Sequence, residues 1–192
     1  MKKLHLHLGA HKTATTHFQT ILESNGHFFP KEVFYEPMHK FRENLKWRHE
    51  QLLEKTSTEY LNHLVKQGKS VLIVSEENLM GETKDLFKYP LVYGGMKPRL
   101  RSLNFFYEQF DQVEIWFGIR TMDEFIPSIY CEYLRHFKYR KFVDVFHGDI
   151  NQSWVSVVEI LQAIFPKSKI NIFPYEGYIG NLRSVLNSMV SN

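Results

Sequence analysis

The chain has 192 residues, of which 43% are hydrophobic and 15% aromatic, so it can bury one sizeable core, and disorder is excluded. Lysine and arginine number 24 against 21 aspartates and glutamates, a small excess that suits a small anionic ligand better than a nucleic acid. The single cysteine, Cys131, excludes an internal disulfide, and no stretch approaches the roughly 18 apolar residues of a membrane span. We therefore expect a cytoplasmic protein that forms one domain over residues 1–192. Its oligomeric state does not follow from the sequence.

The first half of the chain predicts two strands, each with a helix beside it. Leucines alternate with histidines over residues 4–8, a glycine follows, and helical spacing begins at Phe18. Residues 45–65 show helical spacing that stops at Gly68, and the apolar run 71–74 is typical of a strand buried on both faces. The segment between these units, residues 26–41, reads as an irregular connection with a candidate short strand at residues 33–35.

The second half predicts two more strands and the helices that connect them. Residues 96–110 have helical spacing, residues 113–119 alternate as a third strand, and further helical rows begin at Phe125 and Trp154. Residues 169–173 form the fourth strand, and residues 85–95 form a long loop of the kind that covers substrate sites. Because strands alternate with helices, we expect an α/β fold of three layers, α/β/α, with a mostly parallel central sheet.

The loop between the first strand and the first helix carries the candidate site. After Gly9 and Ala10 it reads His11-Lys12-Thr13-Ala14-Thr15-Thr16. Backbone amides at the start of a helix, the charge of Lys12 and the threonine hydroxyls would meet at one bound anion. Gly9 precedes Lys12 by only three positions, so the spacing does not fit the Walker A pattern GxxxxGK[ST]. The loop therefore predicts a phosphate site that differs from the standard ATP or GTP loop.

This loop resembles the 5′-phosphosulfate loop of sulfotransferases, which in bacterial members commonly reads His-Lys-Thr-Gly-Thr-Thr. Five of the six positions match, and Ala14 replaces a glycine, adding a methyl group that disfavours a positive φ. A second segment resembles the family's 3′-phosphate signature, an arginine followed eight residues later by a serine, here Arg120 and Ser128. The resemblance implies a P-loop NTPase-like fold that binds 3′-phosphoadenosine 5′-phosphosulfate (PAPS) through residues 11–16, Arg120 and Ser128, and releases adenosine 3′,5′-bisphosphate (PAP).

Two carboxylates follow the second predicted strand. The segment Ser75-Glu76-Glu77-Asn78-Leu79 looks like the Ser-x-Glu-[Asn/His]-Leu segment that many bacterial sulfotransferases place there. That alignment makes Glu77 the preferred base for the acceptor hydroxyl and Glu76 the second candidate, while Lys12 would stabilise the leaving oxygen. His11 is a further candidate for the base. Both acids could instead only begin the next helix, where its dipole favours them.

The resemblance implies no metal, and the acceptor would be the hydroxyl or amine of a small molecule or carbohydrate. His5 and His7 share one strand face, but no third ligand stands at a recognisable spacing. An atypical ATP-dependent kinase, with Lys12 and Thr13 on phosphate and Mg²⁺, and a non-catalytic nucleotide-binding module with a relic loop are the alternatives. Family members usually continue into a Gly-rich basic loop. The chain ends at Asn192 without an equivalent of this loop, so it would be either a compact variant of the family or a truncated chain.

Overall fold

The computed structural model describes residues 1–48, 52–86, 88–146 and 152–190. Its centre is a sheet of five parallel strands in the order β2 (Val33–Glu36), β5 (Val71–Ser75), β1 (Lys3–Gly9), β6 (Gln112–Ile119) and β7 (Lys169–Pro174). Numbered along the chain, this order is 2-3-1-4-5, the P-loop NTPase-like arrangement. The predicted fold class, the four predicted strands and the candidate strand at residues 33–35 are confirmed.

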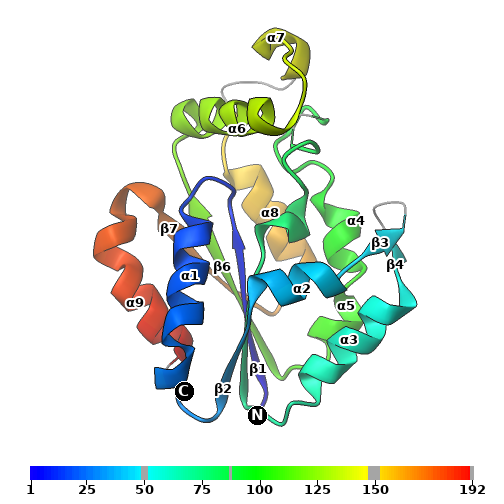
Figure 1. Ribbon diagram of the computed structural model, residues 1–192, viewed down its shortest axis with the longest axis vertical. Coiled ribbons are helices and arrows are strands. Elements are labelled where there is room, and N and C mark those ends of the chain that lie inside the picture. The colour runs from blue at the N-terminus through cyan, green and yellow to red at the C-terminus, as the bar shows by residue number, and fades with distance from the viewer. Residues whose placement is uncertain (49–51, 87, 147–151, 191–192) are drawn as a thin grey trace.

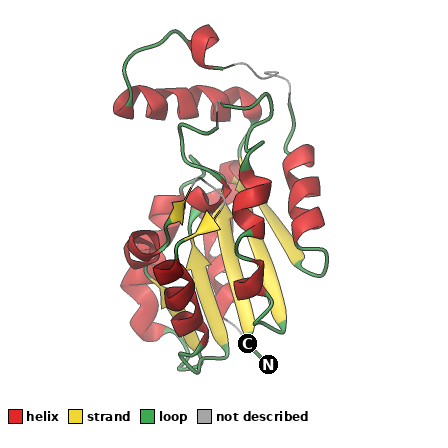
Figure 2. Ribbon diagram, turned by 90° about the vertical axis from the view of Figure 1, so that its right-hand side faces the viewer, coloured by secondary structure: helices red, strands yellow, loops and turns green. Residues whose placement is uncertain are grey.

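Helices cover both faces of the sheet, as Figures 1 and 2 show. One face is covered by α1 (Thr15–Asn25) and α9 (Tyr178–Val190). The other is covered by α2 (Met38–Asn44), α3 (Lys55–Val65), α4 (Met96–Arg101), α5 (Asn104–Tyr107) and α8 (Val155–Ile164). None of the helices in the described part of the chain has the length and apolar character that a membrane crossing requires.

The alternating pattern of the first strand places two kinds of side chain in two cores. Leu4, Leu6 and Leu8 are fully buried on the face of α2, α3 and α8. His5 and His7 are also buried, on the opposite face, where His7 contacts the ring of Phe18. A strand buried on both faces lies in the middle of the sheet. The carboxyl end of β1 therefore lies at the centre of the sheet edge that the carboxyl ends of the strands form.

Helix α6 (Met122–His136) lies above this carboxyl edge, and α7 (Phe142–Val145) lies beyond it (Figure 1). Phe125 anchors α6, since its ring packs on Trp154 at 4.8 Å between centroids. In open parallel sheets ligands bind outside the carboxyl ends of the strands. We therefore expect a ligand site at the edge below α6, where β1, β5 and β6 end.

Three predicted elements differ from the structure. The helix predicted from the spacing of residues 45–53 is wrong where the structure describes this segment, because Trp47–Arg48 (β3) and Leu52–Leu53 (β4) pair as two short antiparallel strands before α3 begins at Lys55. Residues 49–51 of that prediction lie outside the described residues. Short apolar runs fit a helix and a short strand equally well. The helix predicted over residues 96–110 is divided into α4 and α5, and the irregular connection contains the start of α2. The sequence patterns do not predict helices α7 and α9.

Candidate active site

The loop after β1 has an unusual backbone. Gly9, Lys12 and Ala14 adopt left-handed conformations, with φ of 76°, 62° and 61°. Ala14 is the residue before α1, and no side chain caps the amides of the first turn of that helix. A tight turn that leads into an uncapped helix N-terminus directs backbone N–H groups at one point and favours an anion there. Ala14 thus holds the positive φ that glycine would adopt more easily.

Close packing fixes the path of this loop. The Ala10 amide donates to the carbonyl of Gly118 in β6 at 2.6 Å, and the Thr13 hydroxyl donates to the carbonyl of Ala10 at 2.6 Å. A Cβ atom at Gly9 would lie 2.8 Å from Cγ2 of Thr15, so this position needs glycine for space as well as for its φ. Thr13 and Thr15 are buried, and the Thr13 hydroxyl serves the loop itself. Thr16 is exposed.

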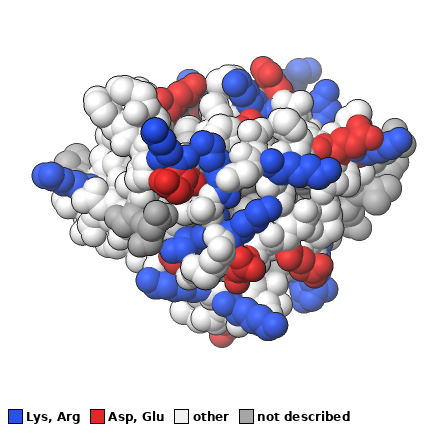
Figure 3. Space-filling model, turned by 90° about the horizontal axis from the view of Figure 1, so that it is seen from below, with Lys and Arg blue, Asp and Glu red and all other residues white. Residues whose placement is uncertain are grey.

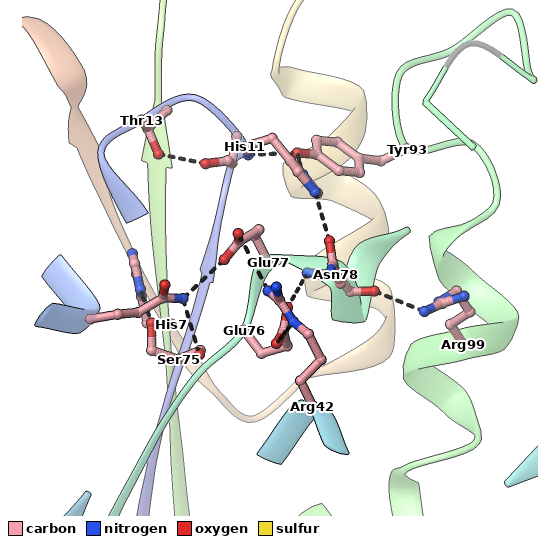
Figure 4. Close-up of polar contacts among 12 residues, drawn as sticks. His7, His11, Thr13, Arg42, Ser75, Glu76, Glu77, Asn78, Tyr93 and Arg99 are labelled. Carbon is pink, nitrogen blue, oxygen red and sulfur yellow. Dashed lines mark hydrogen bonds and ion pairs between the residues drawn. The ribbon is translucent and has the colours of Figure 1, made fainter. Parts of the chain in front are cut away.

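His11 connects the phosphate loop to the loop of residues 85–95. Its backbone N–H donates to the hydroxyl of Tyr93 at 2.9 Å, and that hydroxyl lies 2.8 Å from His11 Nδ1. Its Nε2 lies 3.0 Å from Oδ1 of Asn78 (Figure 4). Burial lowers the pKa of His11, so the ring is neutral and donates from Nε2 to Asn78 while Nδ1 accepts from Tyr93. Both ring nitrogens are therefore engaged, and His11 serves as an anchor.

Glu77 lies directly against the phosphate loop. A Cβ atom at Gly9 would come within 2.9 Å of the Glu77 Cβ, so the first carbons of the Glu77 side chain pack closely against the start of the loop. Its Oε2 accepts from Nε2 of Gln19 at 3.0 Å, and Oε1 is 3.7 Å from the Arg42 guanidinium. Gln19 also donates to the Ser75 carbonyl, so α1 and β5 hold the same carboxylate in place (Figure 4). The Glu77 side chain is largely buried, and a small part of its surface stays exposed.

Glu76 has a different environment. Its two oxygens accept from Nε and Nη2 of Arg42 at 2.9 and 2.7 Å, and Oε1 also accepts the backbone amide of Asn78 at 2.9 Å. The side chain is buried and points toward α2, as Figure 4 shows. Burial raises the pKa of Glu76, and the hydrogen bonds from Arg42 act in the opposite direction. A carboxylate with these partners connects β5 to α2, and it leaves Glu77 as the acid that faces the loop.

Lys12 is paired with α6. Its Nζ lies 3.2 Å from Oε2 of Glu132, which also pairs with Arg135 and His136 of the same helix. Burial raises the pKa of Glu132, but hydrogen bonds from His136 and Lys12 and the charges of Lys12 and Arg135 together lower it to about 2. Glu132 is thus ionised at neutral pH and holds Lys12 between the loop and the helix above it.

Arg120 lies at the carboxyl end of β6, the strand beside β1, as predicted. Its Nε donates to Oε2 of Glu124 at 2.9 Å, and its guanidinium carbon is 4.7 Å from the ring centroid of Tyr175. Within the described residues no hydrogen bond joins Arg120 to Ser128, which lies further along α6 and is half-buried. The two members of the predicted 3′-phosphate pair therefore share an edge of the sheet without touching.

His5 and His7 are core residues. Trp116 Nε1 donates to His5 Nδ1 at 2.9 Å, and His7 Nδ1 is 2.7 Å from the Ser75 hydroxyl. Burial lowers the pKa of both rings to about 4, so both are neutral at pH 7. Throughout the parts of the chain that the structure describes, no three His, Cys, Asp and Glu side chains lie close enough together to hold a metal.

Several residues of this site are beyond the reach of sequence patterns. Gln19 holds Glu77, and Arg42 holds Glu76. Tyr93 holds His11, and Arg99 of α4 donates to the Asn78 carbonyl. Arg42 pairs with Glu76 across 34 positions and Tyr93 with His11 across 82, so no local spacing marks them. The only sequence signal is Gln19, a polar residue beside the buried Phe18 on the inner side of a helix.

Comparison with known proteins shows a structural likeness to a solved structure. No protein-family model matches the chain, and no curated protein sequence matches it. The chain is similar to the crystal structure of the YorR protein from Bacillus subtilis in complex with phosphorylated GDP. The two share 11% sequence identity with a TM-score of 0.44, over 96% of this chain and 95% of that chain. A likeness this weak carries no argument about function. The protein is therefore defined by its own strand order and loop, as an α/β protein with a P-loop NTPase-like fold.

Proposed function

We propose that the protein is a PAPS-dependent sulfotransferase that moves a sulfuryl group to a hydroxyl or amine of a small-molecule or carbohydrate acceptor. The observation that carries the proposal is the contact between Glu77 and the loop after β1. Glu77 packs against Gly9 at the start of this loop and is hydrogen-bonded to Gln19 of α1, and the same loop leads into the uncapped start of α1, which favours an anion. The sequence of residues 11–16 supports the same donor, because it resembles the phosphosulfate loop of this family.

The donor is held at its two anionic ends. The amides at the start of α1 and the ammonium of Lys12 bind the 5′-phosphosulfate. Lys12 leaves its ion pair with Glu132 when it binds the donor. Arg120 binds the 3′-phosphate from the neighbouring strand end. Its partner Glu124 is half-exposed, so that surface pair is weak and a phosphate replaces it readily.

The chemistry requires one base and one stabilised leaving group. Glu77 removes the proton of the acceptor hydroxyl while the hydroxyl oxygen forms a bond to the sulfur of the donor. The bond between sulfur and the bridging oxygen of the donor breaks, and PAP leaves with the negative charge that Lys12 stabilises. Gln19 fixes Oε2 of Glu77, so Oε1 is the oxygen that accepts the proton.

The kinase alternative needs the Thr13 hydroxyl on Mg²⁺. This hydroxyl is buried and donates its proton to the Ala10 carbonyl at 2.6 Å, so a metal would have to reach the lone pairs of an oxygen that is packed inside the loop. No observation favours the kinase over the sulfotransferase.

Thermal unfolding with added nucleotide tests the proposal. PAP in EDTA at about 100 times its dissociation constant should stabilise the protein by about 2.7 kcal/mol, whereas Mg·ATP should do much less. Lys12→Ala should weaken the response, and Lys138→Ala, which removes an exposed lysine outside the site, should not. Transfer of ³⁵S from labelled PAPS to a set of phenols and sugars then tests catalysis. Stabilisation by Mg·ATP alone would support the kinase, and PAP binding without any transfer would support the non-catalytic module.

A further inference from the structure

Arg99 of α4 is a buried cation without an anionic partner. The residue is 7% exposed, and within the described part of the chain no carboxylate lies within ion-pair distance of its guanidinium. One terminal nitrogen, Nη2, donates to the Asn78 carbonyl at 2.9 Å. Its Nε is buried and has no hydrogen-bond partner. The guanidinium carbon lies 4.3 Å from the ring centroid of Trp47.

This arrangement costs stability as it stands. An arginine side chain stays charged in proteins, and a charge removed from water is normally paired or fully hydrogen-bonded. One carbonyl and one aromatic face satisfy only part of a guanidinium that has five donors. A guanidinium with donors to spare is the group that recognises a carboxylate or a sulfate. An anionic group on a bound ligand would supply the partner that Arg99 lacks.

The guanidinium borders a groove of about 530 Å³ between α2, the β3–β4 pair and α4. The charged lining residues of the groove include Arg42, Glu76, Glu82, Lys84 and Arg99. Arg42 is paired with Glu76, and Lys84 lies 3.0 Å from Glu82. Arg99 differs from both, because it is buried and, among the described residues, no carboxylate lies within ion-pair distance of it.

The groove adjoins the proposed base. Asn78, whose carbonyl contacts Arg99, immediately follows Glu77, and its side chain contacts His11 of the phosphate loop (Figure 4). A compound that extends from Arg99 past Asn78 would bring its other end to Glu77. The apolar wall formed by Phe41, Leu45 and Trp47 would contact the body of such a compound.

We propose that this groove binds the acceptor and that Arg99 binds an anionic group on it, so the substrates are hydroxyl compounds that carry a carboxylate or a sulfate. The acceptor role rests on the proposed function, whereas the anion site does not. Such a substrate would give the enzyme selectivity, since a neutral analogue would leave the Arg99 donors unused.

Binding of a matched pair of compounds tests this inference. The probes are 4-hydroxybenzoate and the neutral 4-hydroxybenzamide, titrated by calorimetry into the full chain in EDTA. We expect the carboxylate to bind at least about tenfold more tightly, a difference of about 1.4 kcal/mol. Arg99→Met should abolish the preference, and Arg101→Met, at an exposed position of the same helix, should keep it.

A second measurement avoids the risk that Arg99→Met fails to fold. The Nε–H resonance of Arg99 in the unchanged protein should shift with 4-hydroxybenzoate and stay fixed with the amide. Equal binding of both probes, binding of neither, or a preference that survives Arg99→Met would overturn the inference. PAP is titrated into the same samples, so a protein that binds PAP without preferring the carboxylate refutes this inference alone. A protein that prefers the carboxylate through Arg99 but does not bind PAP refutes the proposed function alone.

Discussion

Glu76 and Glu77 are adjacent in the sequence but have separate roles in the structure. Glu76 is buried and held by both nitrogens of an Arg42 fork, which makes it a link between β5 and α2. Glu77 packs with its Cβ against Gly9, and its carboxylate is hydrogen-bonded to Gln19 of α1. The alignment with the family segment favours Glu77, and that choice stays a prediction about chemistry. What the sequence could not reveal is that Arg42, 34 positions away, occupies the other carboxylate.

The two carboxylates should separate in kinetics. Glu77→Gln keeps the shape of the side chain and its contact with Gln19 but removes the base, so turnover should fall by about 10²–10⁴-fold with little change in PAP affinity. Glu76→Gln should keep turnover and lose stability, because the Arg42 fork then faces a neutral amide. Steady-state rates and urea unfolding measure the two effects. Normal turnover in Glu77→Gln together with loss in Glu76→Gln would reverse the assignment.

Ala14 stands at a backbone position that suits glycine. Its φ of 61° costs a residue with a Cβ atom about 1–2 kcal/mol, and glycine loses about 0.5–1 kcal/mol to its greater freedom when unfolded. Ala14→Gly should therefore raise the free energy of unfolding by about 0.5 kcal/mol. The control, Ala163→Gly in α8, should lower it by about 1 kcal/mol. Urea unfolding measures both, and equal losses in the two variants would contradict the assigned backbone conformation.

At the scale of elements, periodicity predicts the strands well and the short helices poorly. Strand β5 is a continuous apolar run, and β1 and β6 alternate, so their patterns fit a strand much better than a helix. The β3–β4 pair has two residues in each strand, too few for a period to be seen. Residues 175–190 carry no predicted element, although Val185 and Met189 are buried four positions apart on the inner side of α9.

Helix α6 contacts the phosphate loop through one ion pair, between Glu132 and Lys12. Glu132→Gln removes the carboxylate that holds the ammonium, so Lys12 becomes available to an anion without first breaking a pair. A partly exposed pair is worth about 0.2–1 kcal/mol, so PAP should bind about 1.4- to fivefold more tightly. Glu159→Gln makes the same charge change at an exposed position of α8 and should have no effect. Calorimetric titration measures both, and weaker PAP binding in Glu132→Gln would mean that Glu132 itself supports the site.

At the scale of the whole molecule, the face at the amino ends of the strands does not concentrate charge of one sign. Seen from below, toward the amino ends of the strands, Lys and Arg side chains are spread between Asp and Glu side chains (Figure 3). The overall excess of positive charge is only three. Affinity for an anionic nucleotide must therefore come from local geometry, from the uncapped start of α1 and from the cations at the carboxyl edge of the sheet.

The buried histidines make the stability of the fold depend on pH. His7 has an ordinary pKa of 6.5 when unfolded and about 4 in the structure, because burial disfavours its charged form. Between about pH 6.5 and pH 4 the His7 ring is protonated in the unfolded chain and stays neutral in the folded chain. Stability should therefore be full above pH 6.5 and fall as the pH drops toward 4, by about 3 kcal/mol for His7 alone.

Urea unfolding at pH 7 and pH 4.5 measures this loss, and NMR titration of the His7 ring measures its cause. The Glu132 carboxylate, with its pKa lowered to about 2, acts only below this window, between about pH 4.5 and 2. A His7 ring that titrates near pH 6.5, or a stability that does not change down to pH 4.5, would contradict the burial of this side chain in the sheet.

The proposed function depends most on the backbone amides at the start of α1, which should bind the 5′ anionic end of PAP without a metal. Amide ¹H–¹⁵N spectra recorded during a titration with PAP in EDTA follow this binding residue by residue. We expect saturable shifts for the amides of Ala14, Thr15, Thr16 and His17, the residues that begin α1. These shifts should disappear when phosphate-free adenosine replaces PAP. Saturable PAP binding that leaves these four amides unmoved, or no binding at all, would contradict the proposal.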